Sequence, residues 1–248
     1  FSRLAGESSV TGALWAIGAF YLFMALRHRR WSDWALAGFF WSYNLYFYPS
    51  GKMIVPLAGL VTLYALVRWR KDFFRRYALG FAVLWAVGLL TFMPYGIFSA
   101  QDNWNAFTGR ANETSIFSPQ NQAPTFQRYG LQYDPMWAGQ SVVQNFATNP
   151  VAWSGLLYQQ TRETLDALYR RPDHVFYYRI DLHGGTVFQP LWAVLALLGL
   201  AYAVWKVWDA RYALALIWFA VGLSAGILTI DTPNLQRFTG AWPVAMLF

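Results

Sequence analysis

Long apolar stretches alternate with short polar connections along most of the 248 residues of this chain. Six stretches are complete, and a seventh begins at Ala241. The six cover residues 9–26, 33–47, 53–67, 77–95, 187–208 and 212–230. A helix that crosses the hydrocarbon core of a bilayer needs about 20 mainly apolar residues, and four of the six come close to that length. The pattern therefore predicts a polytopic membrane protein built from helices.

The two shorter stretches, 33–47 and 53–67, are joined by the tight turn Tyr48-Pro49-Ser50-Gly51. Pro and Gly are strong turn residues, so the pair is predicted to form a hairpin. Aromatic residues flank both stretches and would complete the span at headgroup level. A hairpin buried in a soluble protein is the alternative interpretation.

The basic residues predict how the helices are oriented. Ten of the 19 lysines and arginines lie in or directly beside the short connections after the first, third and fifth stretches. They are Arg27, Arg29, Arg30, Arg68, Arg70, Lys71, Arg75, Arg76, Lys206 and Arg211. Short connections rich in Lys and Arg stay on the cytoplasmic side of a membrane. Residues 1–8, 96–186 and 231–240 are therefore predicted to lie on the outer face.

The composition agrees with a membrane location and argues against some classes of function. Hydrophobic residues make up 56% of the chain, aromatic residues 20% and charged residues 12%. The net charge of +7 comes mainly from the basic connections, and no solvated basic helix is present, so we do not expect nucleic-acid binding. The chain has no cysteine, which excludes disulfides, zinc thiolates and thiol catalysis.

The predicted fold class is all-α: a transmembrane bundle of about seven helices, the last one truncated, with one long extracytoplasmic loop. Residues 1–95 are predicted to hold four transmembrane helices, and residues 187–248 the other three. Residues 96–186 form the loop between them. Its first part, 99–146, has no sustained period and many turn residues, so no element is predicted there.

The loop contains one clear amphipathic helix, at residues 149–170. Asn149 suits the N-cap and Pro150 suits the first helical position. An apolar stripe at helical spacing consists of Trp153, Leu156, Leu157, Leu165 and Leu168. Arg162 and Asp166 are spaced to form an ion pair on the other face. This helix is predicted to pack against another extracytoplasmic part of the protein, since its polar face carries both signs of charge.

Ionisable side chains at the lip of a membrane are expensive to bury, so they are candidates for function. Three clusters on the predicted outer face contain one: Lys52 near Tyr48, Arg110 near Glu113, and Arg237. Arg offers a bidentate fork to phosphate, and Lys offers a point charge. The clusters are predicted to converge on the phosphate headgroup of a lipid whose tail stays in the bilayer. The alternative is that each cation only anchors the protein at the interface.

These clusters also carry a resemblance to a known family. The matching segments are Arg3-Leu4-Ala5-Gly6-Glu7-Ser8-Ser9, Ala35-Leu36-Ala37-Gly38, Leu45-Tyr46-Phe47-Tyr48 with Lys52, Arg110-Ala111-Asn112, Ser115-Ile116-Phe117-Ser118, and Pro233-Asn234-Leu235-Gln236-Arg237 running to Pro243. In their order and their predicted placement on one membrane face, they resemble the bacterial GT-C-fold glycosyltransferases of the protein-O-mannosyltransferase and aminoarabinose-transferase superfamily. The resemblance touches most of the chain.

The resemblance implies an enzyme that moves a sugar from a polyprenyl phosphate to an acceptor at the extracytoplasmic face of a bacterial inner membrane. Lys52, with Tyr48 beside it, and Arg237 would contact the donor phosphate. Arg110 and Glu113 would line the donor or acceptor cavity. The family's catalytic Asp comes from a first outer loop that precedes the motif, so no catalytic residue is assigned.

Two features set the chain apart from that family. Family members usually carry another helical pair between the motif at Gly6 and the turn at Leu26-Arg27, whereas here Ser9 runs almost directly into a helix. The chain also starts on Phe1 and stops inside the apolar run 244–248, so we expect it to be a piece of a longer protein.

Other functions compete with sugar transfer, first of all that of a non-catalytic scaffold subunit of a larger membrane complex. Haem or pigment binding is disfavoured because His28, His174 and His183 lie outside the predicted helices. A transporter or channel is disfavoured because no acid or base lies in the middle of a predicted helix. The two later histidines, with Asp173 and Asp181, lack the usual metal-binding spacings, so we expect no cofactor, and a divalent metal is not supported.

Overall fold

In the computed structural model, the described residues are 2–47, 49–138, 140–169, 190–230, 232, 237 and 240–245. Their regular structure is helical, as predicted: this part of the chain has no strand, and an isolated β-bridge pairs Ser115 with Thr229. The chain folds into two compact units. Unit 1 comprises Phe1–Asn103, Leu195–Leu223 and Arg237–Phe248, and unit 2 comprises Trp104–Val194 and Ser224–Gln236.

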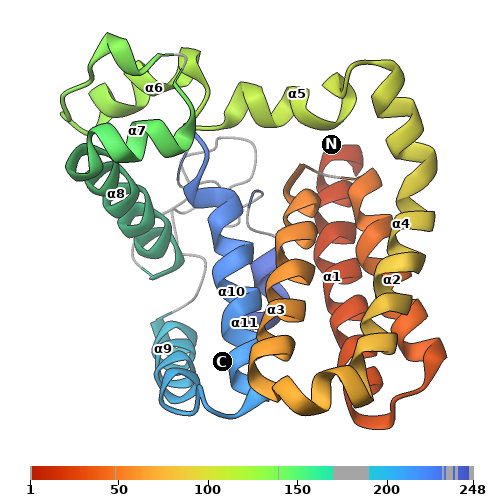
Figure 1. Cartoon of the computed structure of the whole chain (residues 1–248). Coiled ribbons are helices and arrows are strands. Elements are labelled where there is room, and N and C mark those ends of the chain that lie inside the picture. The colour runs from red at the N-terminus through yellow and green to blue at the C-terminus, as the bar shows by residue number, and fades with distance from the viewer. Residues whose placement is uncertain are drawn as a thin grey trace. The chain divides into compact units, whose positions relative to one another are not determined.

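Unit 1 is built from long apolar helices. Its first half has the helices α1 (Ser2–His28), α2 (Trp31–Tyr43), α3 (Ile54–Asp72) and α4 (Ala78–Gln101), with the short turns η1 (Asn44–Tyr46), η2 (Pro49–Met53) and η3 (Phe73–Tyr77). Most of α9 (Pro190–Trp205) and α10 (Ala210–Ile227), together with the short α11 (Trp242–Ala245), complete the unit. The turns η1 and η2 join α2 to α3, where the sequence predicts a hairpin (Figure 1).

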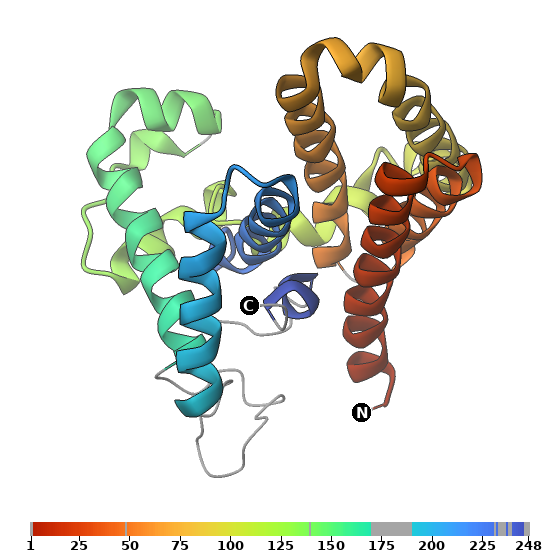
Figure 2. The same cartoon turned by 90° about the horizontal axis from the view of Figure 1, so that it is seen from below.

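Three described segments are long and apolar enough to cross a membrane: Val10–His28, Ser50–Gln101 and Ala210–Ile227. The second is 52 residues long and contains α3 and α4, between which the chain reverses direction at η3 (Figures 1 and 2). By contrast, α2 has 13 residues, and the apolar part of α9, Val194–Trp205, is also shorter than a span. The structure is that of an all-helical protein able to span a membrane, and the predicted seven-helix bundle is not confirmed.

Glycines bring α2 and α4 into close contact. A Cβ added at Gly38 on α2 would overlap the backbone carbonyl oxygen of Leu84 on α4. A Cβ added at Gly80 on α4 would overlap the ring of Trp34, which is 3% exposed. Small residues allow helix backbones to approach this closely inside a membrane. Gly38, which lies in one of the family-like motifs, therefore has a packing role in unit 1.

The C-terminal segment of unit 1 packs against α1 and α10. The indole N–H of Trp218 on α10 donates a hydrogen bond of 2.7 Å to the backbone carbonyl of Gly240. The buried ring of Trp15 on α1 covers the same glycine, at 2.9 Å from where a Cβ would be. A Cβ added at Gly222 on α10 would lie 2.7 Å from the backbone nitrogen of Ala241. The predicted seventh stretch therefore begins inside the packed helices of unit 1.

Unit 2 has a hydrophobic core of its own. Residues 104–169 form the helices α5 (Asn105–Thr114), α6 (Pro119–Arg128), α7 (Val142–Thr148) and α8 (Pro150–Tyr169), with a short turn η4 (Pro135–Trp137). The buried residues between them are Ile116, Phe126, Trp137, Trp153 and Leu156. The segment after α10 joins this core through backbone hydrogen bonds from Ile116 N–H to Leu228 C=O (3.1 Å) and from Ile230 N–H to Thr114 C=O (2.9 Å).

Helix α8 lies where the sequence predicts the amphipathic helix. Trp153 and Leu156 of the predicted stripe are fully buried. The same face continues toward the C-terminus with Gln160 and Thr164, which are also fully buried although they are polar. The predicted pair between Arg162 and Asp166 is present, with 3.9 Å between Nε and Oδ2.

The other three helices of unit 2 correct the prediction that residues 99–146 hold no regular element. Two of them begin at residues of types that favour turns but that also favour the first positions of a helix. Pro119 takes the first position of α6, where a missing N–H costs nothing. Ser141 and Gln144 form a reciprocal capping box at the start of α7.

Candidate functional site

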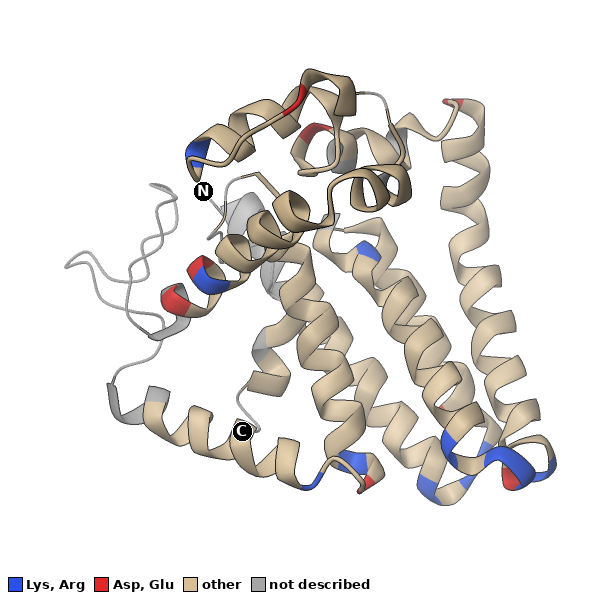
Figure 3. Cartoon of the chain, turned by 60° about the vertical axis from the view of Figure 1, so that its left-hand side comes forward, with Lys and Arg blue, Asp and Glu red and all other residues tan. Residues whose placement is uncertain are grey.

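The basic connections gather at one end of unit 1. Helices α1, α3 and α9 end there, and α2, α4 and α10 begin there (Figures 1 and 3). Lys and Arg residues of all three connections therefore lie at the same end of the unit, which we call the basic end. At the α9–α10 connection, a hydrogen bond from Arg211 lowers the pKa of the Asp209 carboxyl to about 2, so this carboxyl stays ionised to more acid pH than an ordinary aspartate.

Lys52 lies at the opposite end of α3 from the basic end, in the turn η2. Its side chain is half-buried. The preceding Gly51 packs tightly against Asn44 in η1, since a Cβ there would be 2.6 Å from the Asn44 backbone oxygen. Asn44 is fully buried, and neither of its side-chain amide atoms has a hydrogen-bond partner among the described residues. Close packing of η1 on η2 therefore places a buried amide beside the backbone that carries Lys52.

Tyrosines surround the same end of unit 1. The Tyr46 hydroxyl donates a hydrogen bond of 2.7 Å to the Thr91 carbonyl on α4. The Tyr46 ring lies 5.4 Å from the ring of Tyr95 and 5.8 Å from that of Tyr43. Tyr48, the tyrosine that the sequence places in the site, lies outside the described residues. The tyrosine cluster fixes the turn η1 against α4 and gives this end an amphipathic rim.

The remaining predicted site residues fall in different units. Arg237 belongs to unit 1, is partly buried, and lies three residues before Gly240. Arg110 and Glu113 belong to unit 2 and lie on α5. The Glu113 backbone carbonyl accepts a hydrogen bond of 2.8 Å from the Asn121 amide, whereas the Arg110 side chain lies outside the described residues. The convergence of all three cations on one headgroup stays a prediction.

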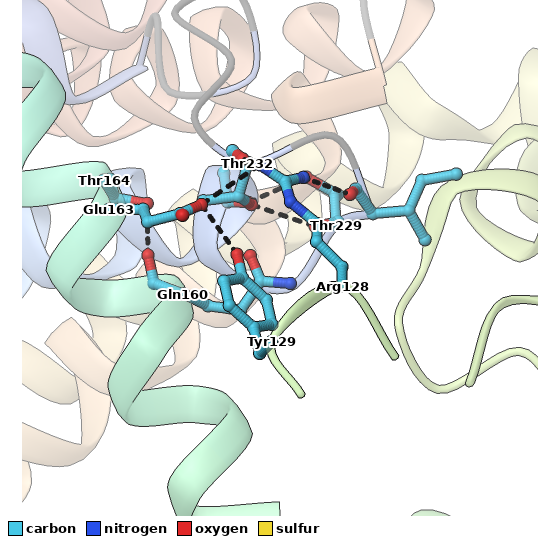
Figure 4. Close-up of polar contacts among 9 residues, drawn as sticks. Arg128, Tyr129, Gln160, Glu163, Thr164, Thr229 and Thr232 are labelled. Atoms are coloured by element: carbon cyan, nitrogen blue, oxygen red, sulfur yellow. Dashed lines mark hydrogen bonds and ion pairs between the residues drawn. The ribbon is translucent and has the colours of Figure 1, made fainter. Parts of the chain in front are cut away.

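A second polar cluster, which the sequence did not indicate, lies in unit 2 where α6 ends (Figure 4). The guanidinium of Arg128 donates to the carboxylate of Glu163 on α8 (3.1 Å) and to the backbone carbonyls of Ile230 (3.2 Å) and Thr232. The Tyr129 hydroxyl donates to the same Glu163 oxygen, at 2.7 Å. One arginine fork therefore ties α6, α8 and the segment after α10 together.

Burial, and then the hydrogen bond to Glu163, raise the pKa of the Tyr129 phenol well above its ordinary value. The phenol therefore stays protonated and keeps donating to the carboxylate at physiological pH. Because one Glu163 oxygen accepts from both Tyr129 and Arg128, this carboxylate is committed to holding unit 2 together. We infer a structural role for the cluster and do not assign Glu163 as a catalytic base.

Metal binding finds no support in the part of the chain that the structure describes. No group of three or more His, Asp or Glu side chains there could hold a metal ion. The two later histidines, His174 and His183, lie outside the described residues, as do Asp173 and Asp181.

Comparison of the chain with protein-family models, with curated proteins and with solved structures found no match in any of the three. The resemblance to lipid-phosphate-dependent glycosyltransferases therefore stays a prediction, which rests on the order of the sequence motifs.

Proposed function

We propose that this protein is a membrane glycosyltransferase that takes its sugar from a polyprenyl phosphate at the extracytoplasmic face of a bacterial inner membrane. The observation that carries the proposal is the position of Lys52. A half-buried cation lies at one end of α3, and the basic end lies at the other. If the basic end is cytoplasmic, as its composition favours, Lys52 meets the outer leaflet.

The chemistry of sugar transfer accounts for a cation in that place. The acceptor hydroxyl oxygen attacks the anomeric carbon, the bond from that carbon to the phosphate oxygen breaks, and the phosphate leaves with the electron pair. A base takes the proton of the acceptor, and fixed positive charge stabilises the charge that develops on the phosphate. Lys52 supplies that charge in our proposal, with Arg237 as its partner. The buried Asn44 packs against Gly51 and so supports the backbone that carries Lys52.

Unit 2 has a separate part in the proposed reaction. It follows α4 and precedes most of α9 in the chain, and it has its own core, so we propose that it is an extracytoplasmic domain that receives the acceptor. Arg110 and Glu113 on α5 are its proposed contacts with the substrates. No residue of the chain is proposed as the catalytic base.

Photo-crosslinking with an undecaprenyl phosphate that carries a diazirine tests the proposal. Lys52→Ala should lower crosslinking of the full chain about tenfold or more, because a hydrogen bond to a charged group is lost. Lys52→Arg should restore most of it. The matched control is Lys206→Ala, which removes one cation from the basic end and should leave crosslinking unchanged.

Equal crosslinking by Lys52→Ala and Lys206→Ala, or equal crosslinking of uncharged undecaprenol, would refute phosphate binding at Lys52. A complex that keeps its function after Lys52→Ala and Arg237→Ala would instead favour the scaffold role. Wild-type protein that binds the lipid should also release polyprenyl phosphate from a labelled lipid-phosphate sugar, and Arg237→Ala should release less.

A further inference from the structure

An open groove of about 430 Å³ lies on unit 1 where α3 ends. Its walls are made by Leu66, Val67, Arg70, Lys71 and Phe74. The surface inside the groove is almost entirely apolar, although two of its five residues are cations. Long basic side chains can line an apolar surface with their carbon stems and keep the charged heads outside. The groove therefore combines an apolar floor with positive charge at its edge.

The backbone of the elbow between α3 and α4 creates this groove. Helix α3 is kinked at Arg70, whose backbone is not helical, and the π-helical turn η3 follows at once. In that turn Phe73 is buried against Phe81 on α4, with ring centroids 5.5 Å apart. The next residue, Phe74, is 75% exposed. A π-helical insertion of this kind is often found at functional sites.

Aromatic packing fixes the elbow as well. The ring of Trp69 lies 4.8 Å from that of Tyr77, and the guanidinium of Arg29 from the α1–α2 connection lies over the same tyrosine ring, 5.6 Å from its centroid. Tyr64 packs edge-on against Trp69 at 6.4 Å. These contacts hold the turn that forms the groove in one conformation, so a ligand would not have to order the groove on binding.

The elbow carries far more positive than negative charge. Residues 68–76 contain five Lys and Arg side chains and a single acid, Asp72. The Asp72 carboxylate forms an ion pair with Arg76, four residues later, at 3.1 Å. Arg70 and Lys71 precede Asp72 in the sequence. Two of the residues that line the groove are therefore cations, and none of them is an acid. This charge suits an anionic occupant.

We propose that the groove binds an anionic glycerophospholipid from the leaflet at the basic end, with an acyl chain along Leu66, Val67 and Phe74 and the phosphate on Arg70 and Lys71. The 19 residues of α3 span about 28 Å, close to the thickness of a bilayer core, so its last turn lies at the headgroup level. Leu63 and Val67, more than half exposed, continue the apolar surface of the groove along α3. The proposal does not rest on sugar transfer, which involves the other end of α3.

Native mass spectrometry of the full chain, offered equal amounts of phosphatidylglycerol and phosphatidylcholine, tests this inference. Wild type should retain phosphatidylglycerol preferentially. The double variant Arg70→Gln with Lys71→Gln should reduce that preference by roughly 20- to 30-fold, since each cation near a membrane surface contributes about fivefold to the binding of an anionic lipid. Val67 is exposed and lines the groove, so a tryptophan side chain there should fill it. Val67→Trp should therefore lower retention of the lipid without any change in charge.

The matched control removes two cations elsewhere at the basic end, by Lys206→Gln with Arg211→Gln. It should leave the lipid preference close to that of wild type. An equal loss in the control would show that only the summed surface charge attracts the lipid, and would overturn the proposal. An unchanged preference in the elbow double variant, or full retention by Val67→Trp, would overturn it as well.

Discussion

Replacing Gly38 by Leu should strongly destabilise unit 1. The added side chain would meet the backbone carbonyl of Leu84, and backbone cannot move aside as a flexible side chain can. We expect a loss of about 3 kcal/mol or more, at the upper end of what overpacking costs. In detergent, the temperature at which half of the full-length protein loses its monodisperse peak should fall by roughly 10 °C.

The control for this experiment is Gly59→Leu on α3. No atom lies within 4 Å of a Cβ added at Gly59, so the same substitution has space there. Leu also has a higher helix propensity than Gly, so the melting temperature should stay the same or rise slightly. Equal destabilisation by the two variants would contradict the close packing of α2 on α4.

Removing the side chain of Arg128 should loosen unit 2. Arg128→Ala deletes the charge-assisted bonds to Glu163 and to two backbone carbonyls, which leaves the Glu163 carboxylate three-quarters buried with the Tyr129 hydroxyl as its remaining partner in the cluster. The expected loss of local stability is about 2–3 kcal/mol. Amide hydrogen exchange in α6 and α8 of the full chain should therefore be roughly 30-fold faster or more.

Arg162→Ala is the matched control, because it removes another arginine that pairs with an acid in unit 2. The Arg162 side chain is 58% exposed and lies 3.9 Å from Asp166, a geometry that contributes at most about 0.5 kcal/mol. Exchange in α6 should change little in this variant. If both substitutions accelerated exchange equally, the cluster around Arg128 would have no special role in joining α6 to α8.

Hydrophobic periodicity predicted the elements that depend on local sequence alone. Helix α8 starts at Pro150 and buries Trp153 and Leu156, as its cap and its stripe indicate. The basic residues likewise predicted that three connections share one end, because charge at helix ends is visible in the sequence. In both cases the information lies within a few neighbouring residues.

Elements that depend on tertiary packing were missed. Helices α5, α6 and α7 have no sustained apolar period, and an aromatic core drawn from separate segments lies between the helices of unit 2. Pro119 and Ser141 could have indicated two of the helix starts, since Pro at a first position and a capping box are local signals. The contacts of Arg128 with residues more than 100 positions away have no such signal.

In the candidate site, too, local sequence indicated some residues, whereas others depend on tertiary packing and were missed. Lys52 was found because a cation beside an apolar hairpin is conspicuous in sequence, whereas Asn44 was not singled out although it is fully buried beside the same turn. The groove at the elbow also escaped notice, because it arises from a kink at Arg70 and a π-helical turn that opens Phe74 to the surface. A basic run in the sequence indicated only the charge of that turn.

The orientation of the helices is the claim on which the proposed function depends, and cysteine labelling tests it most directly. The chain has no cysteine, so single cysteines can be introduced without any background. Met136 in unit 2 and Trp208 at the basic end are well suited, with 77% and 85% of their surface exposed. In intact spheroplasts, a membrane-impermeant maleimide should label Met136→Cys and should label Trp208→Cys only after permeabilisation. Labelling of both in intact spheroplasts, or of Trp208→Cys alone, would contradict the account.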